Sequence, residues 1–134
     1  MSTEYTVLLY SHNPAVRKAM RSAIGDNPAA DVHIEYVESA DYAETVRVID
    51  DYEVDLMLLD GEAQPAGGLG VARQLRDELE DPPTSCVVLA RSADEWLGAW
   101  SRADATLTHP LDPVTTAESV VALLKKRRSP ANSR

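Results

Sequence analysis

A short apolar run in the middle of the chain constrains the fold more than any other stretch. Residues 56–59 read Leu-Met-Leu-Leu, so both faces of this segment are apolar, and the run is too short for a helix. Such a segment is typical of a strand that is covered on both sides in a parallel sheet. Asp60 follows it directly. Because ligands bind beyond the carboxyl ends of the strands in an open α/β sheet, Asp60 occupies a favourable position for function.

The rest of the chain alternates between strand-like and helix-like patterns. Strands are predicted over residues 5–10, 31–37, 56–59, 86–90 and 105–108. Helices are predicted from Pro14 to the stop signal Gly25, after a cap at Ser39, and over residues 69–79, 93–102 and 112–128. The buried face predicted for the last helix consists of Val114, Ala117, Val121 and Leu124. This alternation predicts a doubly wound α/β domain, in which a parallel sheet of about five strands has helices on both faces.

One edge of this sheet is predicted to gather polar residues. Right-handed crossovers place the carboxyl ends of all parallel strands at the same edge. The segments that follow strands one, three, four and five are Ser11-His12, Asp60, Ala90-Arg91 and His109-Pro110. We therefore expect these segments to surround one crevice.

Size and charge narrow the choice of function. The 134 residues suit one domain, expected at residues 1–128, followed by a disordered polar tail at 129–134 and no output domain. The net charge of −9 argues against nucleic acid and favours a protein partner, while the basic residues 125–128 complement a helix dipole.

No segment is long and apolar enough for membrane insertion, so a cytoplasmic location is expected. Cys86 is the single cysteine and is expected to be a buried, inert thiol.

Together these motifs resemble the receiver domain of bacterial two-component response regulators. The resemblance covers residues 5–126 and is nearest to the single-domain chemotaxis type. It rests on Val-Leu-Leu before Asn13-Pro14, on Asp-Leu-Met-Leu-Leu-Asp ending at Asp60 with Gly68 eight residues later, and on His109-Pro110-Leu111-Asp112. The resemblance implies the flavodoxin-like strand order 2-1-3-4-5. It also implies that Asp60 holds the place of the aspartate that accepts a phosphoryl group from a histidine kinase.

The remainder of the phosphorylation pocket departs from this family. Receivers usually carry two adjacent acidic residues after the first strand, which hold a magnesium ion, and these positions are Ser11 and His12 here. The hydroxyl residue that normally follows the fourth strand is replaced by Ala90, and the lysine before the late proline is replaced by His109. Of the usual pocket, only Asp60 remains.

These losses predict a degenerate pocket. Phosphoryl transfer depends on positioning and electrostatic stabilisation, and the metal ion and the lysine are the two main sources of positive charge. Glu62 supplies one further carboxylate, so we expect Mg²⁺ to bind at most weakly and expect no other cofactor. The chain is therefore expected to be a stand-alone, atypical receiver that acts through protein–protein interaction and not as an enzyme. Its expected partner is a histidine kinase or a downstream target.

Three other interpretations of the same residues stay open. In the first, Asp60 is a conventional phosphoacceptor. In the second, Asp60 opens an Asp-Gly turn and has a structural role. Alternatively, His12, Asp60 and His109 are weak candidates for a metal site, because two imidazoles and a carboxylate suit iron, zinc or nickel.

A partner surface is predicted on the helix before the fifth strand. Trp96 and Trp100 lie four residues apart and therefore share one face of that helix. Trp96 is expected to pack on the sheet, whereas Trp100 falls where receivers usually present a solvent-facing residue. The aromatic switch position of receivers, in the fifth strand, is Thr106 here. These three residues form the candidate surface for a partner.

Overall fold

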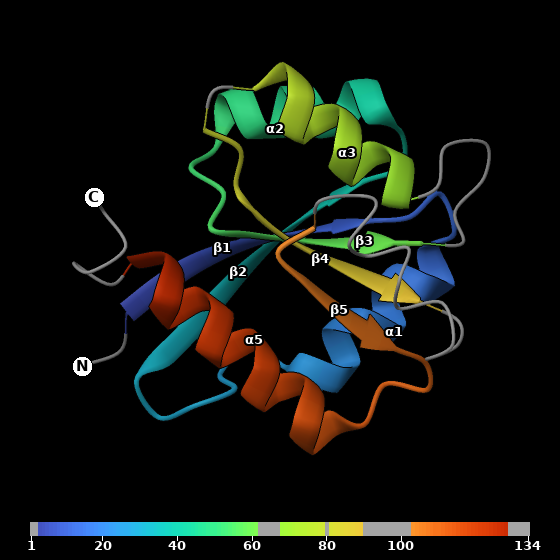
Figure 1. Cartoon of the computed structure of the whole chain (residues 1–134). Coiled ribbons are helices and arrows are strands. Elements are labelled where there is room, and N and C mark those ends of the chain that lie inside the picture. The colour runs from blue at the N-terminus through green and yellow to red at the C-terminus, as the bar shows by residue number, and fades with distance from the viewer. Residues whose placement is uncertain (1–2, 62–67, 80, 90–102, 129–134) are drawn as a thin grey trace.

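A five-stranded, all-parallel sheet forms the centre of the computed structural model, which describes residues 3–61, 68–79, 81–89 and 103–128 (Figure 1). Its strands are β1 (Thr3–Tyr10), β2 (Val32–Ser39), β3 (Leu56–Asp60), β4 (Thr84–Leu89) and β5 (Ala105–Thr108). They lie in the order β2-β1-β3-β4-β5, and each neighbouring pair is parallel. The predicted doubly wound sheet and its strand order are thus confirmed.

Helices cover both faces of the sheet. The described helices are α1 (Pro14–Ile24), α2 (Tyr42–Asp51), α3 (Gly68–Glu78) and α5 (Pro113–Arg128). In the view of Figure 1, α2 and α3 lie above the sheet, and α1 and α5 lie below it. The helix predicted over residues 93–102 lies outside the described residues. None of the described helices is both long and apolar enough to cross a membrane.

The central strand separates two hydrophobic cores. Leu56 and Leu58 face the core shared with α1 and α5, whereas Met57 and Leu59 face the core shared with α2 and α3. Each of these four side chains is at most 1% exposed. The apolar run is therefore a strand buried on both faces, as its sequence predicts.

The predicted cap of the second helix is wrong by two residues. Ser39 still belongs to β2, where it pairs in register with Tyr10, and its buried hydroxyl bonds the Thr45 hydroxyl at 2.8 Å. Asp41 caps α2 instead, because its Oδ1 accepts a hydrogen bond of 2.8 Å from the Glu44 N–H. Both residue types are good caps, so pairing with β1 decides between them.

The buried face of α5 agrees only in part with the prediction. Leu124 is buried and Val121 packs against the core as predicted, whereas Val114 is 64% exposed. Thr116 and Val120, which were not predicted, are also buried. Asp112 caps the start of the helix, since its Oδ2 accepts a hydrogen bond of 2.9 Å from the Thr115 N–H. Apolar residues occur on several sides of this helix, so the sequence alone allowed more than one apolar stripe.

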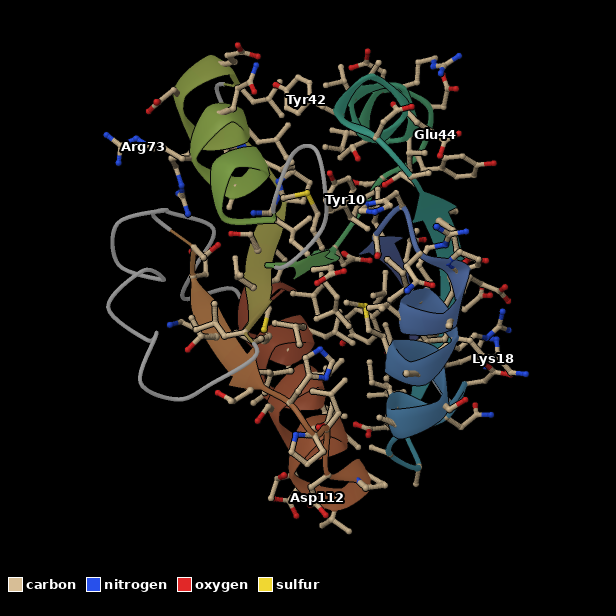
Figure 2. The ribbon with its side chains drawn as sticks, turned by 90° about the vertical axis from the view of Figure 1, so that its right-hand side faces the viewer. Tyr10, Lys18, Tyr42, Glu44, Arg73 and Asp112 are labelled. Carbon is tan, nitrogen blue, oxygen red and sulfur yellow. The ribbon has the colours of Figure 1, made fainter. Side chains whose placement is uncertain are left out.

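A hydrogen bond links the two helices on the upper face. The hydroxyl of Tyr42 in α2 donates to Glu78 Oε2 in α3 at 2.5 Å, and Figure 2 shows Tyr42 pointing into the space between them. Burial, together with this carboxylate, raises the pKa of Tyr42 to about 12, while the same hydrogen bond lowers the pKa of Glu78. The contact ties α2 to α3 beside the second core.

Candidate functional site

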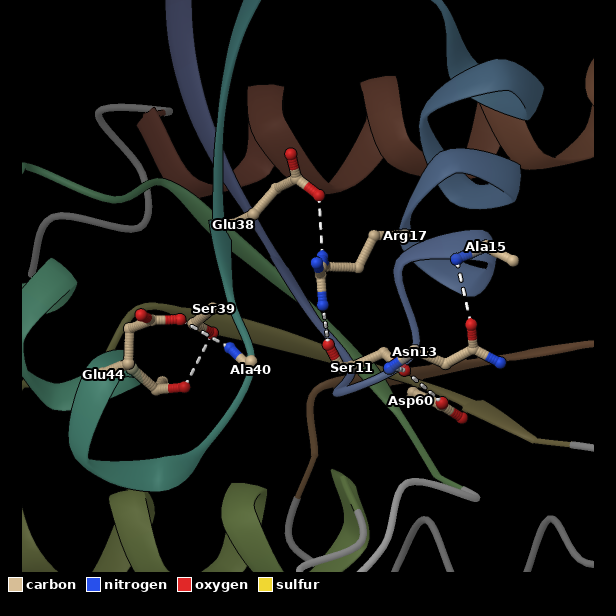
Figure 3. A network of polar contacts seen from close by, with 10 residues as sticks. Ser11, Asn13, Ala15, Arg17, Glu38, Ser39, Ala40, Glu44 and Asp60 are labelled. Atoms are coloured by element: carbon tan, nitrogen blue, oxygen red, sulfur yellow. Dashed lines mark hydrogen bonds and ion pairs between the residues drawn. The ribbon is translucent and has the colours of Figure 1, made fainter.

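The candidate site lies where β1 and β3 end. Asp60 is the last residue of β3 and is 5% exposed, and Ser11 follows β1 and is fully buried. The Ser11 hydroxyl donates a hydrogen bond to Asp60 Oδ2 at 2.8 Å (Figure 3). Two residues that the sequence predicted at one crevice are therefore in direct contact.

The Ser11 hydroxyl is engaged on both sides. It donates to Asp60 and accepts a hydrogen bond of 3.1 Å from the Asn13 N–H. A serine hydroxyl can donate only one hydrogen bond, and Asp60 accepts it. A neutral group thus faces the buried carboxylate at a position where receivers usually carry an acid.

An arginine holds the backbone of Ser11 in place. Arg17 of α1 donates from Nε to Glu38 Oε1 of β2 at 2.7 Å and from Nη1 to the Ser11 carbonyl oxygen (Figure 3). Its side chain is only 16% exposed, whereas that of Glu38 is 52% exposed. The Ser11 N–H also donates to the Ser39 carbonyl oxygen at 3.2 Å. The turn after β1 is therefore bound to α1 and to the end of β2.

Arg17 and Glu38 were missed by the sequence analysis. Arg17 lies in the first turn of α1, three residues after Pro14, and Glu38 pairs in register with Leu9 near the end of β1. A charged residue at the start of a helix and an opposite charge at the end of a neighbouring strand were the available signal. Only the order of the strands shows that the two meet.

Gly61 is required by a close backbone approach. A Cβ atom at this position would lie 2.8 Å from the Val88 carbonyl oxygen, and the Gly61 N–H donates to that same oxygen at 2.9 Å. The glycine of the Asp-Gly pair therefore has a structural role, which is what the turn interpretation proposes. The Asp60 side chain nevertheless points into the polar network and bonds Ser11 (Figure 3).

The histidines do not join Asp60 in a three-ligand site. His12 is exposed, and His109 is half-buried, with its backbone N–H donating to the Leu89 carbonyl oxygen at 2.8 Å. Among the groups of three possible ligands in the described part of the chain, His12, Asp60 and His109 do not form one, since their ligand atoms do not all lie within 4.8 Å of one another. The structure thus does not bring this predicted set together.

The other predicted site residues divide into two groups. Thr106 lies in β5, where it is half-buried and pairs in register with Val87. Outside the described residues lie Glu62, Ala90, Trp96 and Trp100.

Asp60 is one carboxylate of the magnesium site that the resemblance to receivers implies. Mg²⁺ prefers oxygen ligands and demands near-octahedral geometry, usually with one or two carboxylates. In the residues that the structure describes, Asp60 belongs to no group of three carboxylate, imidazole or thiol ligands, and its Oδ2 accepts a hydrogen bond from the neutral Ser11 hydroxyl. A neutral hydroxyl thus lies beside Asp60 where the resemblance implies a second carboxylate.

Comparisons with known proteins agree with the fold. No family model matches the chain. A response regulatory protein of Mycobacterium tuberculosis (strain H37Rv) is 41% identical over 132 residues, which cover 98% of this chain and 97% of that protein, and its counterpart in strain CDC 1551 matches equally well.

Solved structures of receivers have the same fold. The receiver domain of the Francisella response regulator 1452 superposes with a TM-score of 0.75 at 18% identity, covering 92% of this chain and 99% of that one. A response regulator of the LuxR family from Aurantimonas gives 0.75 at 22% identity, covering 98% and 94%. The receiver domain of NarL from M. tuberculosis gives 0.72 at 19% identity, covering 91% and 97%. With the near full-length match to the mycobacterial proteins, this places the chain in the response regulator receiver family of two-component signalling systems.

Proposed function

We propose that this receiver is atypical and signals through protein binding that does not require phosphorylation of Asp60. The hydrogen bond from Ser11 to Asp60 carries the proposal. A hydroxyl stands where the family resemblance places a metal-binding acid, and this hydroxyl is already committed to Asp60 and Asn13. A phosphoryl group arriving at Asp60 would meet little positive charge from these residues.

The chemistry of phosphoryl transfer makes this loss serious. Three negatively charged oxygens must be held in line with the attacking carboxylate, and a metal ion normally offsets their charge. Replacing an acid with Ser11 weakens metal binding, and replacing the usual lysine with His109 removes a permanently charged group. We infer that Asp60 accepts phosphate slowly at best and that Mg²⁺ binds weakly.

The expected partner is another protein, either a histidine kinase or a downstream target. A ligand that does not bind cannot shift a conformational equilibrium, so the conformation that recognises the partner must already be populated in the resting protein. The net charge of −9 disfavours nucleic acid and suits a partner with basic groups. Trp96, Trp100 and Thr106 form the proposed contact surface, and no catalytic role is assigned.

Protein capture with matched variants tests this proposal. The baits are the wild type, Asp60→Asn, Trp100→Ala and Tyr52→Ala, which removes another aromatic that is 53% exposed. We expect Asp60→Asn and Tyr52→Ala to capture the same protein as the wild type, with or without a phosphodonor, and Trp100→Ala to lose it. Circular dichroism must first show that all four are folded. Capture that requires the phosphodonor, or a loss confined to Asp60→Asn, would contradict the proposal.

A further inference from the structure

We propose that Glu4, His33 and Glu35 form a binding site for a divalent transition-metal ion such as zinc or nickel. Glu4 is the second residue of β1 and His33 the second residue of β2, and the two are register partners. Glu35 follows two residues after His33, so both side chains lie on the same face of the sheet. The site lies where the strands begin, at the end opposite to Asp60, and it is independent of the function proposed above (Figure 1).

The three side chains converge closely. One ligand atom from each of them lies within 4.8 Å of the other two. His33 Nε2 is 3.0 Å from Glu35 Oε1. On the other side of the ring, His33 Nδ1 is 3.0 Å from Asn27 Oδ1.

The His33 ring is held from both sides. Asn27 Oδ1 lies at its Nδ1 and Glu35 Oε1 lies at its Nε2. These contacts orient the ring so that Nε2 is directed at the Glu35 carboxylate, which is the arrangement that a shared metal ion requires.

The spacing of the ligands suits a metal ion. Zinc binds imidazole nitrogen and carboxylate oxygen at about 2.1 Å in tetrahedral geometry, so two such ligands lie about 3.4 Å apart. The observed 3.0 Å between His33 Nε2 and Glu35 Oε1 is slightly shorter, so an ion requires only a small outward movement of the exposed Glu35 side chain. Histidines that bind metals usually have an oxygen at their other ring nitrogen, and Asn27 Oδ1 lies 3.0 Å from His33 Nδ1. One imidazole and two carboxylates are ligands that zinc and nickel accept, with water completing the coordination.

The charges around the site also favour a cation. Among the ion pairs of the described residues, Glu35 pairs with His33 alone, and Glu4 pairs with no lysine or arginine. Two carboxylates therefore face one imidazole without a permanently charged partner. A divalent ion would neutralise both of them.

Calorimetric titration of the full chain with zinc chloride tests this site. We expect one ion per chain, bound with a dissociation constant below about 100 μM, and binding at least about tenfold weaker in His33→Gln. Glu35→Gln should weaken binding similarly. Asn27→Ala should weaken it less, because the amide only orients the ring. Circular dichroism should confirm that each variant keeps the fold.

A control variant of His12, which lies at the other end of the sheet, shows where the ion binds. His12→Gln should bind zinc as the wild type does. Loss of binding in His12→Gln with retention in His33→Gln would place the ion near Asp60 and overturn the proposal. Absence of binding up to about 1 mM zinc would overturn it as well and would leave His33 and Glu35 as a hydrogen-bonded pair only.

Discussion

Ser11 is the residue that the structure places in direct contact with Asp60. Its hydroxyl lies between the Asp60 carboxylate and the Asn13 N–H, and Arg17 holds its backbone. A buried carboxylate needs hydrogen-bond partners, and Ser11 supplies one donor. The resting protein thus stabilises Asp60 by local hydrogen bonding.

Removing this hydroxyl should lower stability. We expect Ser11→Ala to reduce the free energy of unfolding by about 1–3 kcal/mol, because it deprives a buried carboxylate of a donor and the Asn13 N–H of its acceptor. Urea denaturation measures the change. The control is Ser22→Ala on the exposed side of α1, which should shift stability by less than about 0.5 kcal/mol. Equal stability of the two variants would show that the bond contributes nothing.

Cys86 should be chemically silent in the folded protein. The thiol is fully buried in β4, and burial raises its pKa to about 12. Since the thiolate is the reactive form, a disulfide reagent at pH 8 should not label the native protein and should label it completely in urea. Labelling of the native protein at the unfolded rate would contradict this burial.

The end of α1 depends on the backbone conformation of Gly25. This residue adopts φ 79° and ψ 178°, a region that is essentially restricted to glycine, and its carbonyl accepts a hydrogen bond of 2.6 Å from the Tyr36 hydroxyl. Gly25→Ala should therefore destabilise the protein by about 1–3 kcal/mol, although a Cβ atom would meet no neighbour within 4 Å.

Gly70 offers a matched control for this glycine. It lies within α3, and a Cβ atom there also meets nothing within 4 Å. Gly70→Ala should stabilise the protein by up to about 1 kcal/mol, because alanine favours the helix. Thermal unfolding of both variants should give shifts of opposite sign. A shift of the same sign in both would refute the conformational explanation.

The start of α5 should contribute a pH-dependent part of stability. Hydrogen bonds from the Thr115 N–H and hydroxyl hold the pKa of Asp112 below its ordinary value of 3.8. A lowered folded pKa means that the stabilisation is fully present above the unfolded value and is lost as pH falls through the folded value. Asp112→Asn should flatten the decline of the urea midpoint below about pH 4 relative to wild type. An identical decline in the two proteins would exclude this contribution.

At the scale of the whole molecule, the fold was largely predictable. The run at residues 56–59 is buried on both faces, and its alternation with helical patterns predicted the layers of the domain. The errors were local, since Ser39 and Asp41 are both suitable caps and only pairing with β1 separates them. Likewise, the phase of α5 depends on packing that its mixed pattern does not specify.

The candidate site was predictable in position but not in detail. Ser11 follows β1 and Asp60 ends the neighbouring strand β3, so their convergence follows from the topology. The direction of the Ser11 hydroxyl depends on Asn13 and on the Arg17–Glu38 pair, whose members lie 21 residues apart in sequence. Such a contact becomes visible only when the strand order and the side-chain conformations are known.

Intact-mass measurement after incubation with acetyl phosphate and Mg²⁺ tests the central claim most directly. The samples are the wild type, Asp60→Asn, and a variant that combines Ser11→Asp, His12→Asp, Ala90→Thr and His109→Lys to restore the usual pocket. We predict no phosphoryl gain in the wild type and a gain of one phosphoryl group in the restored variant. The transfer needs positive charge near Asp60, which the restored metal ligands and lysine would supply. A stable gain of one phosphoryl group in the wild type that is absent from Asp60→Asn would contradict the account.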